Sequence, residues 1–272
     1  MAAKDRDHVL RLREEANAIR KAEAARKRRN RVVAQLSIIG GAIVAIAAVV
    51  VLVIFGPQWF GPKVTPFDSS GQAQVQGAQG APAQVPVVST ADGRGIVLGA
   101  DSAANKVDIY FDFSCPHCQD YHQAVGGDID AAIASGNVQV TFYPINIVAP
   151  YGQQAGGALA SVAKYAPEQT LTVLDGLFGI PAQQQTGWSA NDYAQALKTL
   201  GVTNQEAIDS AARGDYVRWV VNNTTDRPEE ITGTPTVLVN GVKQETLPDQ
   251  AAFQALAQGL PLPAAPTAPA AG

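Results

Sequence analysis

Side chains that bind soft metals or carry redox chemistry are scarce in this chain. Its 272 residues include two cysteines, three histidines and one methionine. Four possible metal ligands lie within eight residues, namely Cys115, His117, Cys118 and His122, but no second pair of ligands follows downstream. In a helix, Cys118 and His122 would share a face while His117 would point elsewhere. The sequence therefore predicts no metal site.

The two cysteines stand in the run Cys115-Pro116-His117-Cys118, where a purely structural disulfide would be of little use. A bridge across a two-residue gap constrains the unfolded chain very little. If a helix begins at this run, the Cys115 sulfur lies at its N-terminus, where unpaired N–H groups and the helix dipole stabilise a thiolate. The Cys118 sulfur lies one turn further in and is placed to resolve a mixed disulfide. Pro116 loses no hydrogen bond in the first turn, and a cationic His117 would further favour the thiolate.

Charged residues are absent from residues 32–55. At about 1.5 Å per residue, a helix of this length crosses a hydrocarbon core of about 30 Å, so we expect a single transmembrane helix. A cleaved signal peptide is the alternative, but its apolar region and charged leader are usually shorter. Residues 1–31 carry eleven Lys or Arg against five acids, whereas Lys63 and Arg94 are the only basic residues in the forty positions after the span. This asymmetry predicts a cytoplasmic N-terminus.

Basic residues are also few after residue 55, where nine stand against nineteen acids. An acidic segment of this kind is a poor candidate for nucleic-acid binding, whose signature is a basic face. The predicted topology places this part of the chain outside the cytoplasm, at the cell membrane, where disulfides form and persist. The cysteine pair is therefore expected to cycle between dithiol and disulfide.

Composition divides the chain into five parts. A basic cytoplasmic segment (1–31) and the transmembrane helix (32–55) precede residues 56–84, whose Gly, Pro and Gln content is typical of a flexible linker. Residues 85–260 are long enough for one folded domain. The Pro- and Ala-rich residues 261–272 are expected to form a disordered tail.

Periodicity within residues 85–260 predicts an α/β domain. The expected strands are 107–113, 138–143 and a hairpin over 236–242 that turns at Asn240-Gly241. Helical stretches broken by Pro, Gly and Asn run over about 151–226, and a closing helix is expected over 248–258. A helical insertion thus interrupts a strand–helix–strand unit and a terminal hairpin.

This order of elements resembles the DsbA-like members of the thioredoxin superfamily, and the resemblance covers the whole folded domain. Its two anchors are more than a hundred residues apart: Phe111-Asp112-Phe113-Ser114-Cys115-Pro116-His117-Cys118 and Gly233-Thr234-Pro235-Thr236-Val237-Leu238-Val239-Asn240-Gly241. The resemblance implies a thioredoxin-like fold with a helical insertion, preceded here by a single transmembrane helix. It also implies a thiol–disulfide oxidoreductase in which Cys115 is the exposed attacking cysteine and Cys118 the buried resolving one.

The second anchor contributes the expected substrate-binding loop. A proline that opens a strand cannot donate to the ladder, and Pro235 is similar to the cis-proline that such folds bring beside the active cysteine. The resemblance implies that the backbone of Thr234 pairs with an extended substrate segment and so holds a substrate cysteine near Cys115. An ordinary edge proline is the alternative.

One position departs from the family pattern. Many relatives carry a buried acid six residues before the first cysteine, where it helps to move protons, and this chain has Ile109 there. Asp112 instead matches an acid seen in relatives three residues before the cysteine. Its role is open between a solvated or helix-capping carboxylate and a proton carrier.

Together these features predict a membrane-anchored, extracytoplasmic thiol:disulfide oxidoreductase. It needs no cofactor beyond the Cys115–Cys118 disulfide, which it donates to exported proteins with paired thiols. The resemblance implies reoxidation by a quinone-linked membrane protein. A reductase or isomerase would use the same residues from the dithiol form. The other alternative is a non-catalytic thioredoxin-fold module that binds peptides, since fold does not dictate function.

Overall fold

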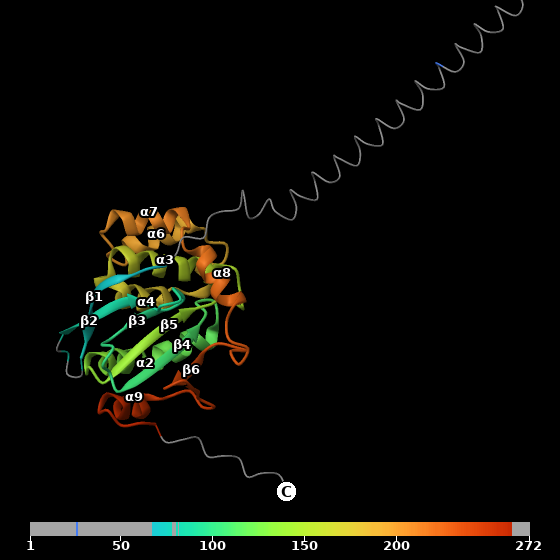
Figure 1. The fold of residues 1–272 in the computed structure, drawn as a ribbon. Coiled ribbons are helices and arrows are strands. Elements are labelled where there is room, and N and C mark those ends of the chain that lie inside the picture. The colour runs from blue at the N-terminus through green and yellow to red at the C-terminus, as the bar shows by residue number, and fades with distance from the viewer. Residues whose placement is uncertain (1–25, 27–66, 78–79, 81, 263–272) are drawn as a thin grey trace, which may run out of the picture. The chain divides into compact units, whose positions relative to one another are not determined.

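A computed structural model describes Arg26 and residues 67–77, 80 and 82–262. Within these ranges the chain folds around one mixed sheet of order β1-β2-β3-β5-β4-β6-β7 (Figure 1). The strands are β1 (Ser70–Gln76), β2 (Pro82–Ser89), β3 (Ile96–Leu98), β4 (Asn105–Phe111), β5 (Val138–Pro144), β6 (Thr236–Val239) and β7 (Val242–Lys243). Strands β4 and β5 pair in parallel, and the other neighbours pair antiparallel.

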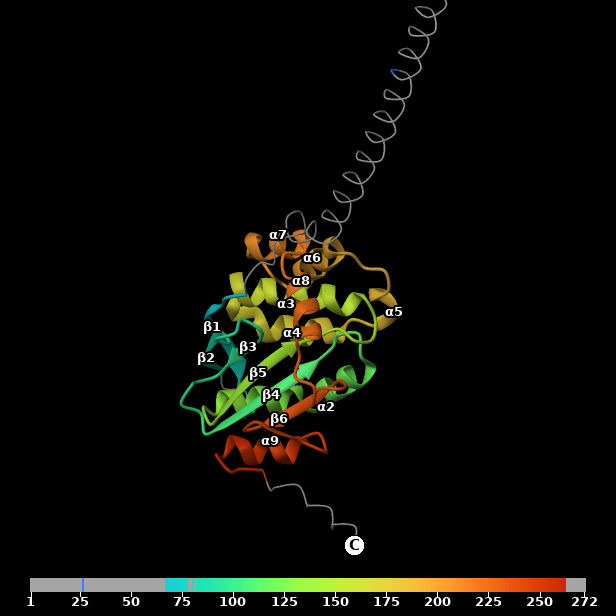
Figure 2. The same ribbon diagram turned by 45° about the vertical axis from the view of Figure 1, so that its right-hand side comes forward.

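Helices cover the sheet and form a separate group at one end of the domain. They are α2 (Pro116–Ala134), α3 (Tyr151–Tyr165), α4 (Thr170–Gly179), α5 (Ala182–Gln185), α6 (Ala190–Thr199), α7 (Gln205–Arg213), α8 (Val217–Thr225) and α9 (Gln250–Ala257), with a short 3₁₀ helix, η2 (Pro167–Gln169). Figures 1 and 2 show α3, α6 and α7 gathered at one end and α9 at the other. The helical group is the expected insertion between β5 and β6, so the α/β fold with inserted helices is confirmed.

The elements expected around the sequence anchors are present. The hairpin turns at Asn240 and Gly241, which both have positive φ angles (51° and 78°), as a type I′ turn requires. The closing helix α9 begins after Asp249, whose side chain accepts a hydrogen bond from the N–H of Ala252 (2.9 Å). Strand β3 lies outside the predicted elements, and α5 falls in a break between the predicted helical stretches, because three and four residues are too few to show a period.

The expected linker is wrong over its last part, because the hairpin of β1 and β2 extends the sheet beyond β3. Ala73 and Val75 of β1 are each 1% exposed, and the ring of Phe67 lies 4.7 Å from that of Trp219. Glutamines alternate with these buried residues, so a Gln- and Ala-rich composition concealed a strand. The folded domain therefore begins before residue 85.

The predicted transmembrane helix, residues 32–55, lies outside the described residues, as do the basic segment apart from Arg26, the first part of the linker (56–66) and the tail from residue 263. In the part of the chain that the structure does describe, none of the helices combines the length and apolar character that a membrane crossing needs.

Strand β4 separates two apolar clusters, because successive side chains point to opposite faces of a sheet. Ile109 and Phe111 face the main core. Tyr110 faces a smaller cluster with Ile145, and its ring stacks on that of Tyr143 with 4.5 Å between centroids. The strand ends at Phe111, two residues before its predicted end, and the chain then turns into the cysteine motif. Both cysteines therefore lie just beyond the C-terminal end of β4, a strand with neighbours on both sides.

Candidate redox site at the start of α2

Helix α2 begins at Pro116, and Cys115 is its N-cap residue. The N–H groups of Cys118 and Gln119 donate to the Cys115 carbonyl oxygen (3.1 and 3.2 Å), which closes the first turn. No side chain caps this helix end. The helix N-terminus is therefore free to stabilise negative charge on the Cys115 sulfur. Pro116 and His117 are exposed in the same turn.

Both cysteines are free thiols, and both are buried. Cys115 is 5% exposed and Cys118 is 2% exposed, so the expectation of an exposed attacking cysteine is wrong for the chain without a partner. Burial raises the pKa of the Cys118 thiol well above its ordinary value, despite the Asp112 N–H that lies 3.5 Å from its sulfur. Cys118 thus holds its proton at neutral pH.

The loop before β6 lies against the first cysteine. The Thr234–Pro235 peptide bond is cis, as expected, and Cys115 Sγ lies 3.3 Å from the carbonyl oxygen of Thr234. The Thr236 hydroxyl donates to the Gly233 carbonyl oxygen (2.7 Å) and closes this loop. Because β6 pairs antiparallel with β4, the start of the second sequence anchor lies beside the end of the first.

From the sequence, Asp112 was expected to be either a solvated or helix-capping carboxylate or a proton carrier. The first of these two roles is wrong. Its side chain is fully buried, and Oδ1 accepts hydrogen bonds from the N–H (2.7 Å) and hydroxyl (2.6 Å) of Ser114. Oδ2 accepts from the N–H groups of Ile147 (2.8 Å) and Val148 (2.9 Å), and the Ala149 N–H donates to the Ser114 hydroxyl (2.9 Å). The carboxylate therefore fastens the loop between β5 and α3 to the segment before Cys115.

Gly152 leaves the space that this network needs. A Cβ atom at this position would lie 2.2 Å from Asp112 Oδ1 and 2.9 Å from the Ser114 hydroxyl oxygen. Sequence reasoning did not find Gly152 or the loop. The pairing of Asp112 with Ser114 two residues later is a local turn signal, but the loop partners come from more than thirty residues away.

His122 lies one helical turn after Cys118. Its Nε2 atom is 2.7 Å from Asp175 Oδ1 on α4, and its ring stacks on Phe178 with 4.6 Å between centroids. Across residues 67–77, 80 and 82–262 there is no group of three His, Cys, Asp or Glu side chains suited to hold a metal ion. Through its contacts with Asp175 and Phe178, the His122 side chain joins α2 to α4.

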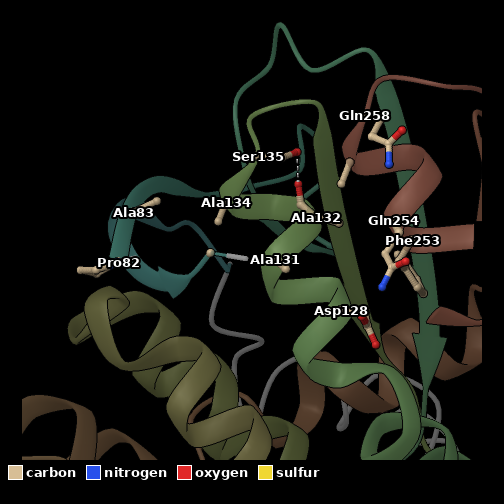
Figure 3. Close-up of a pocket in the computed structure, with 12 residues that line it drawn as sticks. Pro82, Ala83, Asp128, Ala131, Ala132, Ala134, Ser135, Phe253, Gln254 and Gln258 are labelled. Atoms are coloured by element: carbon tan, nitrogen blue, oxygen red, sulfur yellow. Dashed lines mark hydrogen bonds between the residues drawn. The ribbon is translucent and has the colours of Figure 1, made fainter. Parts of the chain in front are cut away.

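A separate cavity of about 560 Å³ lies away from the cysteines. Figure 3 shows its walls: Pro82 and Ala83 of β2, Ala131 in the second half of α2, and Phe253 and Gln254 of α9. None of the predicted site residues lines it. The redox site at the start of α2 is therefore not part of this cavity.

Solved structures with the same fold include three bacterial proteins. They are the thiol-disulfide oxidoreductase MdbA from Corynebacterium diphtheriae (23% identity, 72% of this chain and 98% of that chain covered, TM-score 0.50), reduced DsbA from Mycobacterium tuberculosis (20%, 61% and 92%, 0.53) and oxidised BdbD from Bacillus subtilis (20%, 60% and 90%, 0.50). Comparison with curated proteins gives no match. At these identities the likeness shows the fold.

Family membership rests on the sequence itself. The thioredoxin family model (Thioredoxin_4) matches residues 91–258, which is more than half of the chain and includes both cysteines and Pro235. The predictions of a thioredoxin-like domain and of a protein disulfide oxidoreductase agree with this match. The chain belongs to the thioredoxin family.

Proposed function

We propose that this protein is a thiol:disulfide oxidoreductase that works as an oxidase and donates its Cys115–Cys118 disulfide to exported proteins with paired thiols. The contact of 3.3 Å between Cys115 Sγ, at a helix N-terminus, and the carbonyl oxygen of Thr234, before the cis-proline, carries this proposal. The unpaired N–H groups at the helix end lie where negative charge forms on the Cys115 sulfur when the disulfide opens, and this would favour reduction of the disulfide. Membership in the thioredoxin family supports the same chemistry.

The reaction moves two electrons from a substrate dithiol to the enzyme disulfide; of the two protons that the substrate thiols give up, one ends on Cys118 and the other goes to solvent. A substrate thiolate attacks Cys115 Sγ, the Cys115–Cys118 bond breaks, and Cys118 leaves and takes up a proton. The second substrate thiolate then attacks the substrate sulfur of the mixed disulfide, and Cys115 leaves as a thiolate. The high pKa of Cys118 favours the first step, because protonation removes Cys118 as a competing nucleophile.

The loop at Thr234 and Pro235 is the proposed substrate-binding backbone. An extended segment that pairs with Thr234 would place its cysteine next to Cys115, as strand addition does at other sheet edges. Backbone pairing of this kind does not depend on the side chains of the substrate, which suits an enzyme with many unrelated substrates.

We further propose that residues 32–55 hold the protein in the cell membrane as a single pass, with a cytoplasmic N-terminus and an extracytoplasmic redox domain. The uncharged run and its basic leader support this topology. A quinone-linked membrane protein would reoxidise the dithiol, and no cofactor beyond the cysteine pair is needed. Nucleic acid is not a proposed partner, because the residues after 55 are acidic.

Two measurements test the proposal. Replacing Cys118 with Ala should leave mixed disulfides with exported proteins on Cys115, and the lack of any adduct in cells would point to a binding module without turnover. Equilibration with glutathione gives the reduction potential, for which we expect a value nearer to about −120 mV than to about −270 mV. A potential near the lower value would overturn the oxidase direction and favour a reductase.

A further inference from the structure

The Cys118 thiol needs a group that exchanges protons with it. Only the thiolate attacks a disulfide, so Cys118 must lose its proton when it resolves a mixed disulfide on Cys115 and regain it in the reverse step. Burial holds this proton strongly. Asp112 is committed to five donors around it, and Ile109 has no group that accepts a proton.

A small cavity of about 20 Å³ lies beside Cys118, which is room for a single water molecule. Its walls are mainly hydrocarbon, from residues that include Ile109 and Phe142. Cys118, Tyr121 and His122 are the lining residues whose side chains end in groups that exchange protons. The group that accepts the Cys118 proton is therefore either Tyr121 or His122.

Tyr121 does not fit the role. Its hydroxyl donates to the Pro248 carbonyl oxygen (2.9 Å), and burial raises its pKa well above the ordinary value for a phenol. It therefore stays neutral, with its proton already engaged.

His122 has the geometry that the role needs. Its Nε2 atom faces Asp175 Oδ1 at 2.7 Å, and among the described residues no hydrogen-bond partner is found for Nδ1. An imidazole that donates through Nε2 keeps Nδ1 as an acceptor, and the carboxylate stabilises the imidazolium that forms. The His122 side chain is 13% exposed while that of Asp175 is 51% exposed, so the pair leads from the buried cavity to solvent.

We propose that His122, held by Asp175, accepts the proton of the Cys118 thiol across this cavity and returns it when Cys118 leaves the disulfide. In the resolving step the Cys118 S–H bond breaks, its proton passes to His122, and its electron pair forms the bond to Cys115. The partner thiolate leaves and takes a proton from solvent. This inference rests on the proposed function, because it concerns a step of that reaction.

A second ionisable group on α2 is influenced by the charge of Asp175. Asp130 lies two turns after His122 on the same face of α2, and burial, with Asp175 close by, raises its pKa to about 7. It would titrate in the same range as an imidazole. The strands behind the cavity contribute the apolar side chains of Ile109, Phe111 and Phe142. A test by pH must therefore separate His122 from Asp130.

The two thiol attacks can be timed separately. Reduced full-length protein is mixed with glutathione disulfide, quenched in acid, and assayed by mass spectrometry for the glutathione adduct on Cys115. Formation of the adduct reports attack by Cys115, and its decay reports attack by Cys118. In H122Q we expect decay at about pH 7 to be slower by about 100-fold or more, with formation changed by less than about twofold.

The pH profile separates proton transfer from a structural effect. Wild-type decay should reach a plateau as the pH rises, whereas decay in H122Q should keep rising about tenfold per pH unit as solvent removes the proton. H122F keeps the stack on Phe178 and should behave like H122Q. D175N should slow decay as well, while D120N, the same change on the exposed side of α2, should not.

Each result bears on one claim. Profiles of H122Q and H122F that coincide with the wild type, with thermal unfolding showing both variants folded, would overturn the role of His122. A plateau lost in D130N but kept in H122Q would assign the proton to Asp130 and overturn it too. If the wild type forms no adduct at all, the proposed function itself fails.

Discussion

Cys115 Sγ and the carbonyl oxygen of Thr234 lie 3.3 Å apart, although 119 positions separate the two residues in the sequence. The sheet explains this contact, because β6 runs antiparallel beside β4. The loop that enters β6 therefore lies at the end of β4 from which the chain continues into the cysteine motif. One pair of strands thus holds both the nucleophile and the backbone proposed to bind substrate.

Asp112→Asn should destabilise the domain. The amide replaces one acceptor oxygen with an N–H₂ group that faces donors, so buried N–H groups lose their partner. We expect the free energy of unfolding to fall by about 2–3 kcal/mol, measured by urea unfolding. Asp120→Asn on the exposed side of α2 should change it by less than about 0.5 kcal/mol. Equal effects of the two changes would mean that the buried network adds no stability.

Gly152→Ala and Gly127→Ala should have opposite effects, although both residues lie within helices. A Cβ at residue 152 collides with the Asp112 carboxylate at 2.2 Å, whereas nothing lies within 4 Å of one at residue 127. Alanine in open helix should stabilise by about 0.5–1 kcal/mol, and the collision should cost more than about 1 kcal/mol. Thermal unfolding of both variants checks this, and a Gly152→Ala variant as stable as the wild type would contradict the packing around Asp112.

Asp130→Asn should stabilise the protein at alkaline pH. The folded-state pKa of Asp130 is about 7, above the ordinary 3.8, because burial and then Asp175 disfavour its charge. The folded protein therefore retains a proton that the unfolded chain releases, and this contribution to stability is complete below about pH 4 and lost as the pH rises through about 7.

Since asparagine mimics the neutral carboxyl, the gain from Asp130→Asn should be present at about pH 8 and absent at about pH 4. Urea unfolding at both pH values measures it, with Asp120→Asn as the control. A gain that does not depend on pH would show that the Asp130 carboxyl is solvated.

Val75→Ala tests whether β1 belongs to the folded domain. Val75 is 1% exposed while Gln74 beside it is exposed. We expect the free energy of unfolding to fall by about 1–2 kcal/mol for Val75→Ala and by less than about 0.5 kcal/mol for Gln74→Ala. If neither change alters the urea midpoint, residues 70–76 act as the linker that their composition first suggested.

Local signals were enough for much of the fold. The alternation in β4 and β5, the Asn240-Gly241 turn and the Pro- and Gly-broken helices each reflect rules that act over a few residues. The missed elements lack such signals: β1 is hidden by glutamines, and β3 has three residues. Their stability comes from neighbours in the sheet, which sequence periodicity does not report.

The sequence by itself determined the chemistry of this protein. A Cys-x-x-Cys pair after a strand places one thiol at a helix N-terminus and the second one turn later. An X-Pro before a later strand marks the loop that lies beside the first thiol. Only the tertiary structure decided which groups touch these thiols. The groups around the thiols come from different elements. They are the Thr234 carbonyl oxygen beside the buried Cys115, the loop bonded to Asp112, and the His122–Asp175 pair. Such contacts depend on how strands pair and helices pack over long distances in the chain, and burial then sets the proton affinity of Cys118.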